Sequence, residues 1–214
     1  MKKSKVMVGL PSGPSIPISF MLSYPNAVKL KSDHGKPYLY NFRGTNAATA
    51  RNACVYRMLK GNFTHLFFMD SDMVFPKKTL QRLLDRDVDI VGGFYVRKRK
   101  GFLPTAFLKG HRIGGKYMTE WVTDYREVEG IGTGCLLIKR EVFEKVGVPW
   151  FEYKWSGPLA PDGHMVTEDL TFCDKAIDKG YKIWCDGTIR CGHAGSFIIW
   201  PDEVTPGKNN IEPV

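Results

Sequence analysis

The stretch Leu66-Phe67-Phe68-Met69-Asp70-Ser71-Asp72 decides the fold of this 214-residue chain. An apolar run leads directly into two carboxylates, and Pro76 follows them. Such a run is typical of a buried strand in an α/β sheet. Because side chains alternate along a strand, we expect Asp70 and Asp72 to point the same way and Ser71 the other. In an open α/β sheet, this end of the strand is where ligands bind.

Two like charges at a strand end repel each other and lose hydration. A divalent cation would relieve both effects, because carboxylate oxygens suit Mg²⁺ and Mn²⁺. The sequence therefore predicts a metal site at Asp70 and Asp72. The alternative interpretation is a plain loop that precedes a helix beginning at Pro76.

The rest of the chain alternates apolar strand patterns with helical ones, which predicts a mostly parallel α/β sheet with a mixed or antiparallel extension. We expect one domain over residues 1–200 and a polar tail over 201–214. The predicted strands are 5–10, 64–70, 88–95, 135–138 and 181–185, with short β segments over 38–40 and 101–129. The predicted helices are 18–30, 45–60 capped by Thr45, 76–86, 140–146 and 168–180, and a long loop is expected over 150–163.

The composition is that of a globular protein, with 43% hydrophobic residues and no apolar stretch long enough for a membrane span. We therefore expect a cytoplasmic protein without a transmembrane segment. Five cysteines without a C-x-x-C motif argue against a disulfide framework and a zinc ribbon. Cys185, Cys191 and His193 remain an alternative set of zinc ligands, although their spacing fits no common zinc motif.

The net charge of +9 favours a polyanionic partner, and the densest basic run is Arg97–Lys100. A solvated loop explains the same run. The chain has no P-loop motif and no G-x-S-x-G motif. The glycines of 130–134 precede a predicted strand instead of following one, so they do not form a dinucleotide-binding loop.

Several motifs occur together in the order seen in one enzyme family. They are Asp70-Ser71-Asp72 followed by Met73–Pro76, an Ala-rich helix with Arg51-Asn52, the segment Gly132-Thr133-Gly134, Glu168-Asp169 at a helix start, and His193. Over residues 5–195 the chain resembles GT-A glycosyltransferases of the compact, family-2-like type found in phage and bacteria. The resemblance implies a GT-A fold and a hexosyltransferase-like enzyme that moves a sugar from a nucleotide-sugar donor, UDP- or GDP-linked, to an acceptor hydroxyl.

The resemblance also implies roles for the acids and the histidine. Mn²⁺ or Mg²⁺ would stabilise the charge on the departing diphosphate. Asp72 is the expected direct ligand, Asp70 would contact the metal or the ribose, and His193 is a third candidate ligand. Asp169 is the expected general base, with Glu168 as the other candidate. Stabilisation of a helix N-terminus explains Glu168 and Asp169 equally well, and His193 could be structural.

The remaining expected contacts belong to the two substrates. The donor side is assigned Pro11, Ser12, Gly13, Arg51, Asp70 and Ser71, and the sugar or acceptor side Gly132, Thr133, Gly134 and Trp150. Aromatic residues in the loop over 150–155 could form a lid against a sugar, or a small hydrophobic core instead. Arg51 could equally be a surface residue of its helix.

Two other functions stay open at this point. The first is a nucleic-acid-binding protein that uses the basic run, either without enzymatic activity or as a glycosyltransferase of modified DNA bases. The second is a nucleotidyltransferase, which also uses paired aspartates. That second class usually has a phosphate-binding loop after its first strand, and Pro11–Pro14 carries no such basic or glycine-rich sequence.

Overall fold

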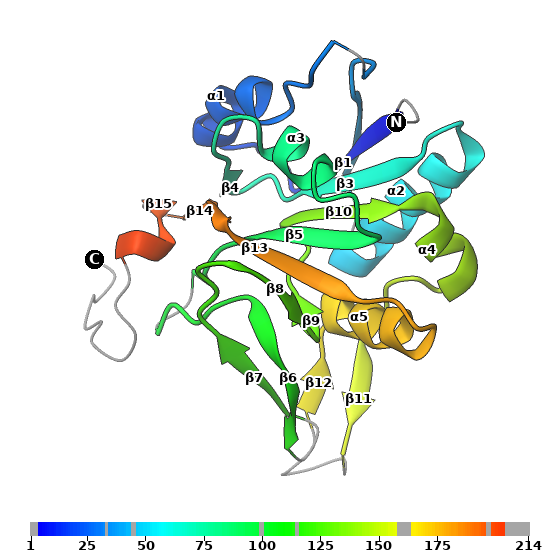
Figure 1. Ribbon diagram of the computed structural model, residues 1–214, viewed down its shortest axis with the longest axis vertical. Coiled ribbons are helices and arrows are strands. Elements are labelled where there is room, and N and C mark those ends of the chain that lie inside the picture. Colours follow the sequence, from blue (N-terminus) through cyan, green and yellow to red (C-terminus); the bar gives the residue numbers. More distant parts are fainter. Residues whose placement is uncertain are drawn as a thin grey trace.

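The structure, a computed structural model, describes residues 4–32, 34–43, 46–98, 101–113, 116–157, 164–195 and 198–203 (Figure 1). Its centre is a seven-stranded mixed sheet with the order β2-β1-β3-β10-β5-β13-β8. Five of the seven strands run in one direction, and β10 and β8 run against them. The strands are β1 (Val6–Ser12), β2 (Tyr38–Arg43), β3 (His65–Met69), β5 (Ile90–Phe94), β8 (Tyr125–Val128), β10 (Cys135–Lys139) and β13 (Ile183–Arg190). The prediction of a mixed, mostly parallel α/β sheet flanked by helices is therefore confirmed.

Helices cover both faces of this sheet, because the strand side chains alternate between two apolar cores. Leu66 and Phe68 of β3 belong to the core under α2 (Ala47–Lys60), α4 (Arg140–Val146) and α5 (Glu168–Asp178). Phe67 and Met69 belong to the core on the opposite face, under α1 (Ile18–Ala27) and α3 (Thr79–Leu84). A strand buried on both faces needs a continuous apolar run, which is what β3 has.

Three smaller sheets extend the structure beyond the central sheet. One joins β4 (Met73–Val74), β14 (Gly192–Ala194) and β15 (Ile198–Ile199), and a short 3-10 helix, η1 (Pro201–Glu203), follows. Another joins β6 (Ala106–Ile113), β7 (Lys116–Glu120) and β9 (Gly130–Ile131). The third is the hairpin of β11 (Lys154–Ser156) and β12 (His164–Val166). The β4–β14 pairing matters most for the site, because it brings the segment after β3 next to His193.

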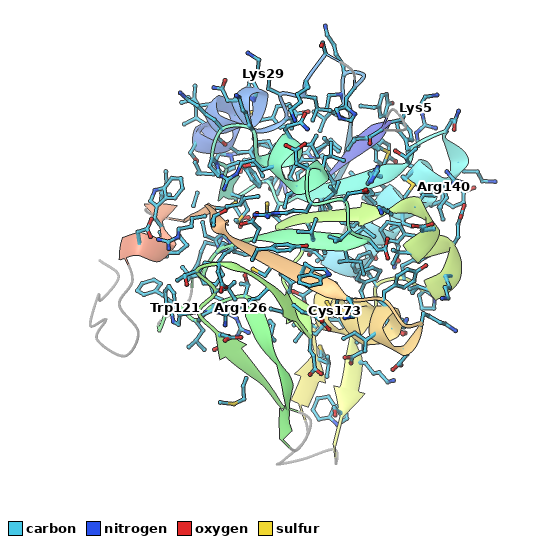
Figure 2. All side chains as sticks on the ribbon, in the orientation of Figure 1. Lys5, Lys29, Trp121, Arg126, Arg140 and Cys173 are labelled. Atoms are coloured by element: carbon cyan, nitrogen blue, oxygen red, sulfur yellow. The ribbon has the colours of Figure 1, made fainter. Side chains whose placement is uncertain are left out.

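Arg140 fixes α2 to the start of α4 (Figure 2). Its guanidinium donates to the carbonyls of Leu59 at 2.8 Å and Gly61 at 2.9 Å, at the C-terminal end of α2. The last carbonyls of a helix have no partner within the helix, so a cation placed there stabilises both the hydrogen bonds and the helix dipole. This contact holds α2, whose other end reaches the candidate site described below, in a fixed position.

The ends of three elements in the structure differ from the predicted ones. β3 ends at Met69, so the acids that follow belong to a turn and not to the strand. α2 is capped by Asn46, whose side chain accepts from the Thr49 amide at 2.9 Å, while Thr45 lies outside the described residues. α3 begins at Thr79 and not at Pro76, because Lys78 takes a left-handed φ of 59° immediately before it.

Three further expectations concern disulfides, a metal site and membrane-spanning helices. All five cysteines are free and buried, which agrees with the argument against a disulfide framework. Across the described residues, no three metal-ligating side chains are grouped closely enough to hold an ion. This applies to Cys185, Cys191 and His193, and equally to Asp70, Asp72 and His193. None of the helices in that part of the chain is long and apolar enough to cross a membrane. The tail from 204 onward lies outside the described residues.

Candidate active site

A cavity of about 320 Å³ opens at the ends of β1 and β3, the two adjacent parallel strands in the middle of the sheet. The N-terminus of α2 faces the same cavity. Its lining residues are Pro11, Ser12, Gly13, Asn46, Ala47, Ala50, Arg51, Asp70, Ser71, Asp72 and Glu168. This is the edge at which parallel α/β sheets bind ligands, and a helix N-terminus there favours an anionic group.

The end of β2 holds the turn that follows β1. Asn41 donates through its side-chain amide to the Leu10 carbonyl at 3.0 Å and to the Ser12 hydroxyl at 2.8 Å. Arg43 donates to the Pro14 carbonyl at 2.8 Å. The wall of the cavity formed by Pro11, Ser12 and Gly13 is thereby held by side chains of the neighbouring strand.

The two aspartates share the cavity because of a turn and not because of strand alternation. The Met73 amide donates to the Asp70 carbonyl at 3.1 Å, which closes the turn. The Asp70 amide donates to the Gly134 carbonyl at 3.1 Å, and the Ala194 amide donates to the Asp72 carbonyl at 2.7 Å. Backbone from two distant segments therefore fixes the turn, and Ser71 also lines the cavity instead of pointing away from it.

Arg51 joins two of the acids in the wall of the cavity. Its Nη2 atom lies 3.0 Å and 3.1 Å from the two carboxylate oxygens of Asp70, and its Nη1 atom lies 2.9 Å from Glu168 Oε1. Burial opposes the charge of Arg51, but Asp70 and Glu168 raise its pKa well above the usual range. Burial raises the pKa of both acids, and Arg51 opposes that rise. Arg51 is therefore a buried counter-ion and not the surface helix residue of the alternative interpretation.

Asp72 has a different set of partners. Its Oδ2 atom forms an ion pair with the ammonium of Lys98 and lies 3.5 Å from His193 Nε2. Burial would raise the pKa of Asp72, but hydrogen bonds from His193 and Lys98 hold it well below its usual range. The repulsion between Asp70 and Asp72, which suggested a metal, is thus reduced by protein cations. Arg51 pairs with Asp70, and Lys98 pairs with Asp72.

The charges at the site nevertheless do not balance. Four carboxylates contribute negative charge at the site. Those of Asp70, Glu168 and Asp169 lie close enough to Arg51 to raise its pKa, and that of Asp72 pairs with Lys98. Four carboxylates against the two cations Arg51 and Lys98 leave an excess of two negative charges when His193 is neutral. That excess equals the charge of one divalent cation, and it would repel an anionic ligand that arrived without one.

The donor atoms at Asp72 and His193 fit such a cation. His193 Nδ1 lies 2.8 Å from the Val96 carbonyl, and a carbonyl can only accept, so Nδ1 carries the proton. When Nε2 gives up its hydrogen bond to Asp72, the neutral ring presents the Nε2 lone pair, which is the form in which histidine binds metals. With two protein ligands, the remaining positions on Mg²⁺ or Mn²⁺ would belong to water and phosphate oxygens, as is usual for these ions at phosphate sites.

Glu168 and Asp169 begin α5 but differ in their surroundings. Glu168 is buried and forms an ion pair with Arg51, so Arg51 balances its charge within the wall of the cavity. Asp169 is half-buried, and its Oδ1 atom accepts from the Leu170 amide at 2.9 Å and from the Thr167 hydroxyl. Within the described parts of the chain, Asp169 alone of the four acids makes no ion pair. Asp169 is thus better suited than Glu168 to accept a proton.

The segment Gly132-Thr133-Gly134 lies behind the cavity and is buried, so it does not line the cavity as predicted. The Gly134 amide donates to the Tyr95 hydroxyl at 2.9 Å. A Cβ atom on Gly132 would lie 2.3 Å from that hydroxyl, which explains why glycine is needed there. The segment supports Asp70 through the Gly134 carbonyl and packs Tyr95 beneath the site.

Trp150, predicted on the sugar or acceptor side, is buried and does not line the cavity. Its side chain is 8% exposed, and its indole Nε1 donates to the Phe143 carbonyl at 2.9 Å. The neighbouring Phe151 stacks on Phe172 of α5 with ring centroids 4.8 Å apart. Trp150 and Phe151 are therefore part of the core, as the alternative interpretation had it, whereas Tyr153 and Trp155 are exposed. Residues 158–163 of the predicted lid lie outside the described residues.

The site contains residues that the sequence analysis did not assign to it. Asn46 lines the cavity, and its place directly before an Ala-rich helix was an available signal for a cap. Lys98 reaches Asp72 from the basic run, which was read as a solvated or polyanion-binding loop. Tyr95, two residues after Gly93, packs edge-on against His193 with centroids 5.5 Å apart. No local pattern marks Tyr95 as a site residue.

The basic run is less available to a polyanion than its charge suggests. Lys98 is paired with Asp72, and the guanidinium of Arg97 lies 5.5 Å from the centre of the Phe107 ring. Arg99 and Lys100 lie outside the described residues. Half of the run is therefore engaged within the protein.

A larger cavity, about 460 Å³, lies at the opposite edge of the sheet, beside Thr64 and Lys139. Its lining carries the carboxylates of Asp85, Asp87, Glu141 and Glu144 and the cations of Lys139 and Arg140. Lys139 lies 3.4 Å from Asp87 and 3.3 Å from Asp89, and Arg140 lies 2.6 Å from Glu144. The smaller cavity is the better candidate because it lies at the carboxyl ends of β1 and β3, where parallel α/β sheets bind ligands.

Comparison with known proteins bears on the fold. No protein-family model matches the sequence, and no curated protein matches it. Among solved structures, the crystal structure of A197 from STIV is similar, with a TM-score of 0.66 and 20% sequence identity over 98% of this chain and 97% of that chain. A likeness at this identity shows a shared fold along almost the whole chain, and function must be argued from the site itself.

Proposed function

We propose that this protein is a metal-dependent glycosyltransferase with a GT-A fold that transfers a sugar from a nucleotide-sugar donor to an acceptor hydroxyl. The observation that carries the proposal is the cavity at the ends of β1 and β3, lined by Asp70, Asp72, Glu168 and Arg51 beside the N-terminus of α2. Two more charges lie next to it: Lys98 pairs with Asp72, and Asp169 is close enough for its charge to act on Arg51. An anionic diphosphate can enter a cavity with this excess of negative charge only together with a cation.

Each wall of the cavity has a part in this reaction. The turn of Pro11, Ser12 and Gly13 would contact the nucleoside, and the N-terminus of α2 would favour the diphosphate through its dipole. Asp72 and His193 would hold Mn²⁺ or Mg²⁺. When bound, the ion acts as a Lewis acid that stabilises the charge developing on the departing diphosphate.

Asp169 would act as the general base that takes the proton from the acceptor hydroxyl. Hydrogen bonds from Thr167 and Leu170 hold its Oδ1 atom, and no cation in the described structure neutralises it. A base held in place in this way keeps its orientation while the hydroxyl attacks the sugar carbon. Glu168 would have the separate role of keeping Arg51 in place against Asp70.

The proposal is tested by calorimetry with UDP- and GDP-sugars in the presence and absence of Mn²⁺, followed by a donor-hydrolysis assay. Asp72→Ala is expected to lose Mn²⁺-dependent donor binding, and Asp169→Asn to keep binding but lose turnover. Asp124→Asn removes an equivalent charge at an exposed position and serves as the control. Full donor affinity in Asp72→Ala, or full turnover in Asp169→Asn, would remove that residue from the mechanism.

The competing nucleic-acid-binding function has less support, because Lys98 is paired with Asp72 and Arg97 lies over the Phe107 ring. A protein of that class would bind DNA with an affinity that falls steeply as salt is added, and it would turn over no sugar nucleotide. The same preparation can be assayed for both properties, so the two functions are directly distinguishable.

A further inference from the structure

Lys98 forms an ion pair with Asp72, the acid that is proposed to bind the divalent cation. Its ammonium pairs with Asp72 Oδ2, the same oxygen that lies 3.5 Å from His193 Nε2. One carboxylate oxygen cannot serve the ammonium and a divalent ion equally well, because the two positive charges would repel each other at close range. Lys98 and the cation are therefore competitors for Asp72.

The backbone that precedes Lys98 is anchored, while the lysine side chain is partly exposed. The Val96 carbonyl is held by His193 Nδ1, and the Arg97 amide donates to the Leu103 carbonyl at 2.9 Å. The Lys98 side chain is 36% exposed and Asp72 is 34% exposed. A lysine has a long flexible stem, and an ion pair this accessible to water is weak, so the ammonium can leave Asp72 without a change in the fold.

We propose that Lys98 is a built-in counter-ion that holds Asp72 until a divalent cation and a nucleoside diphosphate group arrive together, and that its ammonium then moves to the diphosphate. This inference rests on the proposed function. An ammonium suits the second position because lysine binds phosphate oxygens as a compact point charge. The exchange also keeps Asp72 paired while the cation is absent.

The proposal predicts two changes of opposite direction when Lys98 is replaced. Loss of the competitor should make Mn²⁺ alone bind Lys98→Ala about two- to fivefold more tightly than wild type, the size expected for one exposed ion pair. Loss of the phosphate contact should make UDP or GDP bind the Mn²⁺-saturated variant about tenfold more weakly. A lysine that only stabilised the fold would not produce this opposite pair of effects.

The experiment titrates Mn²⁺ by electron paramagnetic resonance and then UDP and GDP by calorimetry at saturating Mn²⁺, using wild type, Lys98→Ala and Lys98→Arg. Lys98→Arg keeps the charge and is expected to retain weak Mn²⁺ binding. Lys77→Ala removes one exposed lysine elsewhere and is the matched control, and melting temperatures show that each variant is folded.

The outcomes separate this inference from the proposed function. Tighter Mn²⁺ binding with weaker nucleotide binding in Lys98→Ala alone supports both. If wild type binds Mn²⁺ and nucleotide but Lys98→Ala has the same two affinities, the inference is overturned and the proposed function stands. If wild type binds neither Mn²⁺ nor nucleotide, both are overturned.

Discussion

Arg51 offers the sharpest test of how the site is held together. Its side chain is 5% exposed and lies between Asp70 and Glu168 at distances of 3.0 Å and 2.9 Å. Replacing it by methionine, which preserves much of the apolar stem, leaves the buried Glu168 and the half-buried Asp70 without their cation. Breaking a buried pair in this way costs about 3–5 kcal/mol in the free energy of unfolding. For a chain of this size, that corresponds to a fall in melting temperature of roughly 6–20 °C.

The deficit should also depend on pH in a known direction. Burial already raises the pKa of Asp70 and of Glu168, and Arg51 is what opposes that rise. Without Arg51 the folded protein holds these two protons more tightly than the unfolded chain does. Stability therefore increases as pH falls through the range between the unfolded and folded pKa values, and the deficit of Arg51→Met should be larger at pH 8 than at pH 5.

The assay is urea unfolding followed by circular dichroism at both pH values. Arg57→Met, an exposed position on the same helix, is the control and should change stability by about 0.5 kcal/mol or less. The double variant Arg51→Met with Glu168→Gln should recover part of the loss, because one of the two orphaned charges is gone. The reasoning is refuted if Arg51→Met is no less stable than the control, or if its deficit grows at low pH.

Two further predictions concern positions outside the cavity. Burial, and then the charge of Lys139, lower the pKa of His65 to about 4, so the unfolded chain takes up a proton first and stability should fall between about pH 6.5 and 4. His65→Gln should flatten that fall by about 1–2 kcal/mol in urea unfolding at pH 7 and 4.5, and an unchanged fall would contradict the assignment. Trp150→Ala should lower stability by about 3–5 kcal/mol because it empties a core position, yet leave donor affinity in calorimetry unchanged. A loss of donor affinity in a folded Trp150→Ala protein would restore Trp150 to the binding site.

The position of the site was predictable from local sequence. The continuous apolar run before Asp70 predicts a strand buried on both faces, and the end of such a strand lies at the edge of the sheet where ligands bind. The same applies to α2 and α5, whose starts carry residues that favour helix N-termini. Pro11, Ser12, Gly13, Arg51, Asp70, Ser71, Asp72 and Glu168 all line one cavity, as that reasoning expected.

The details within the site were not predictable in this way. The alternation rule assigned Asp70 and Asp72 to one side, but the strand ends at Met69 and a turn brings them together. The aromatic residues around Trp150 have the same composition in a lid as in a core, so only their packing against α5 could decide between the two. Gly132 is explained by the position of Tyr95, which follows β5 and lies far from Gly132 along the chain.

The sequence by itself determined which elements form and which edge of the sheet carries the acids, because both depend on patterns within a few residues of one another. Only the tertiary structure decided which cation serves which acid. Arg51 is 19 residues from Asp70, and Lys98 is 26 residues from Asp72. Charge acts through space and is indifferent to chain order, so these partners follow from how the strands and helices are packed.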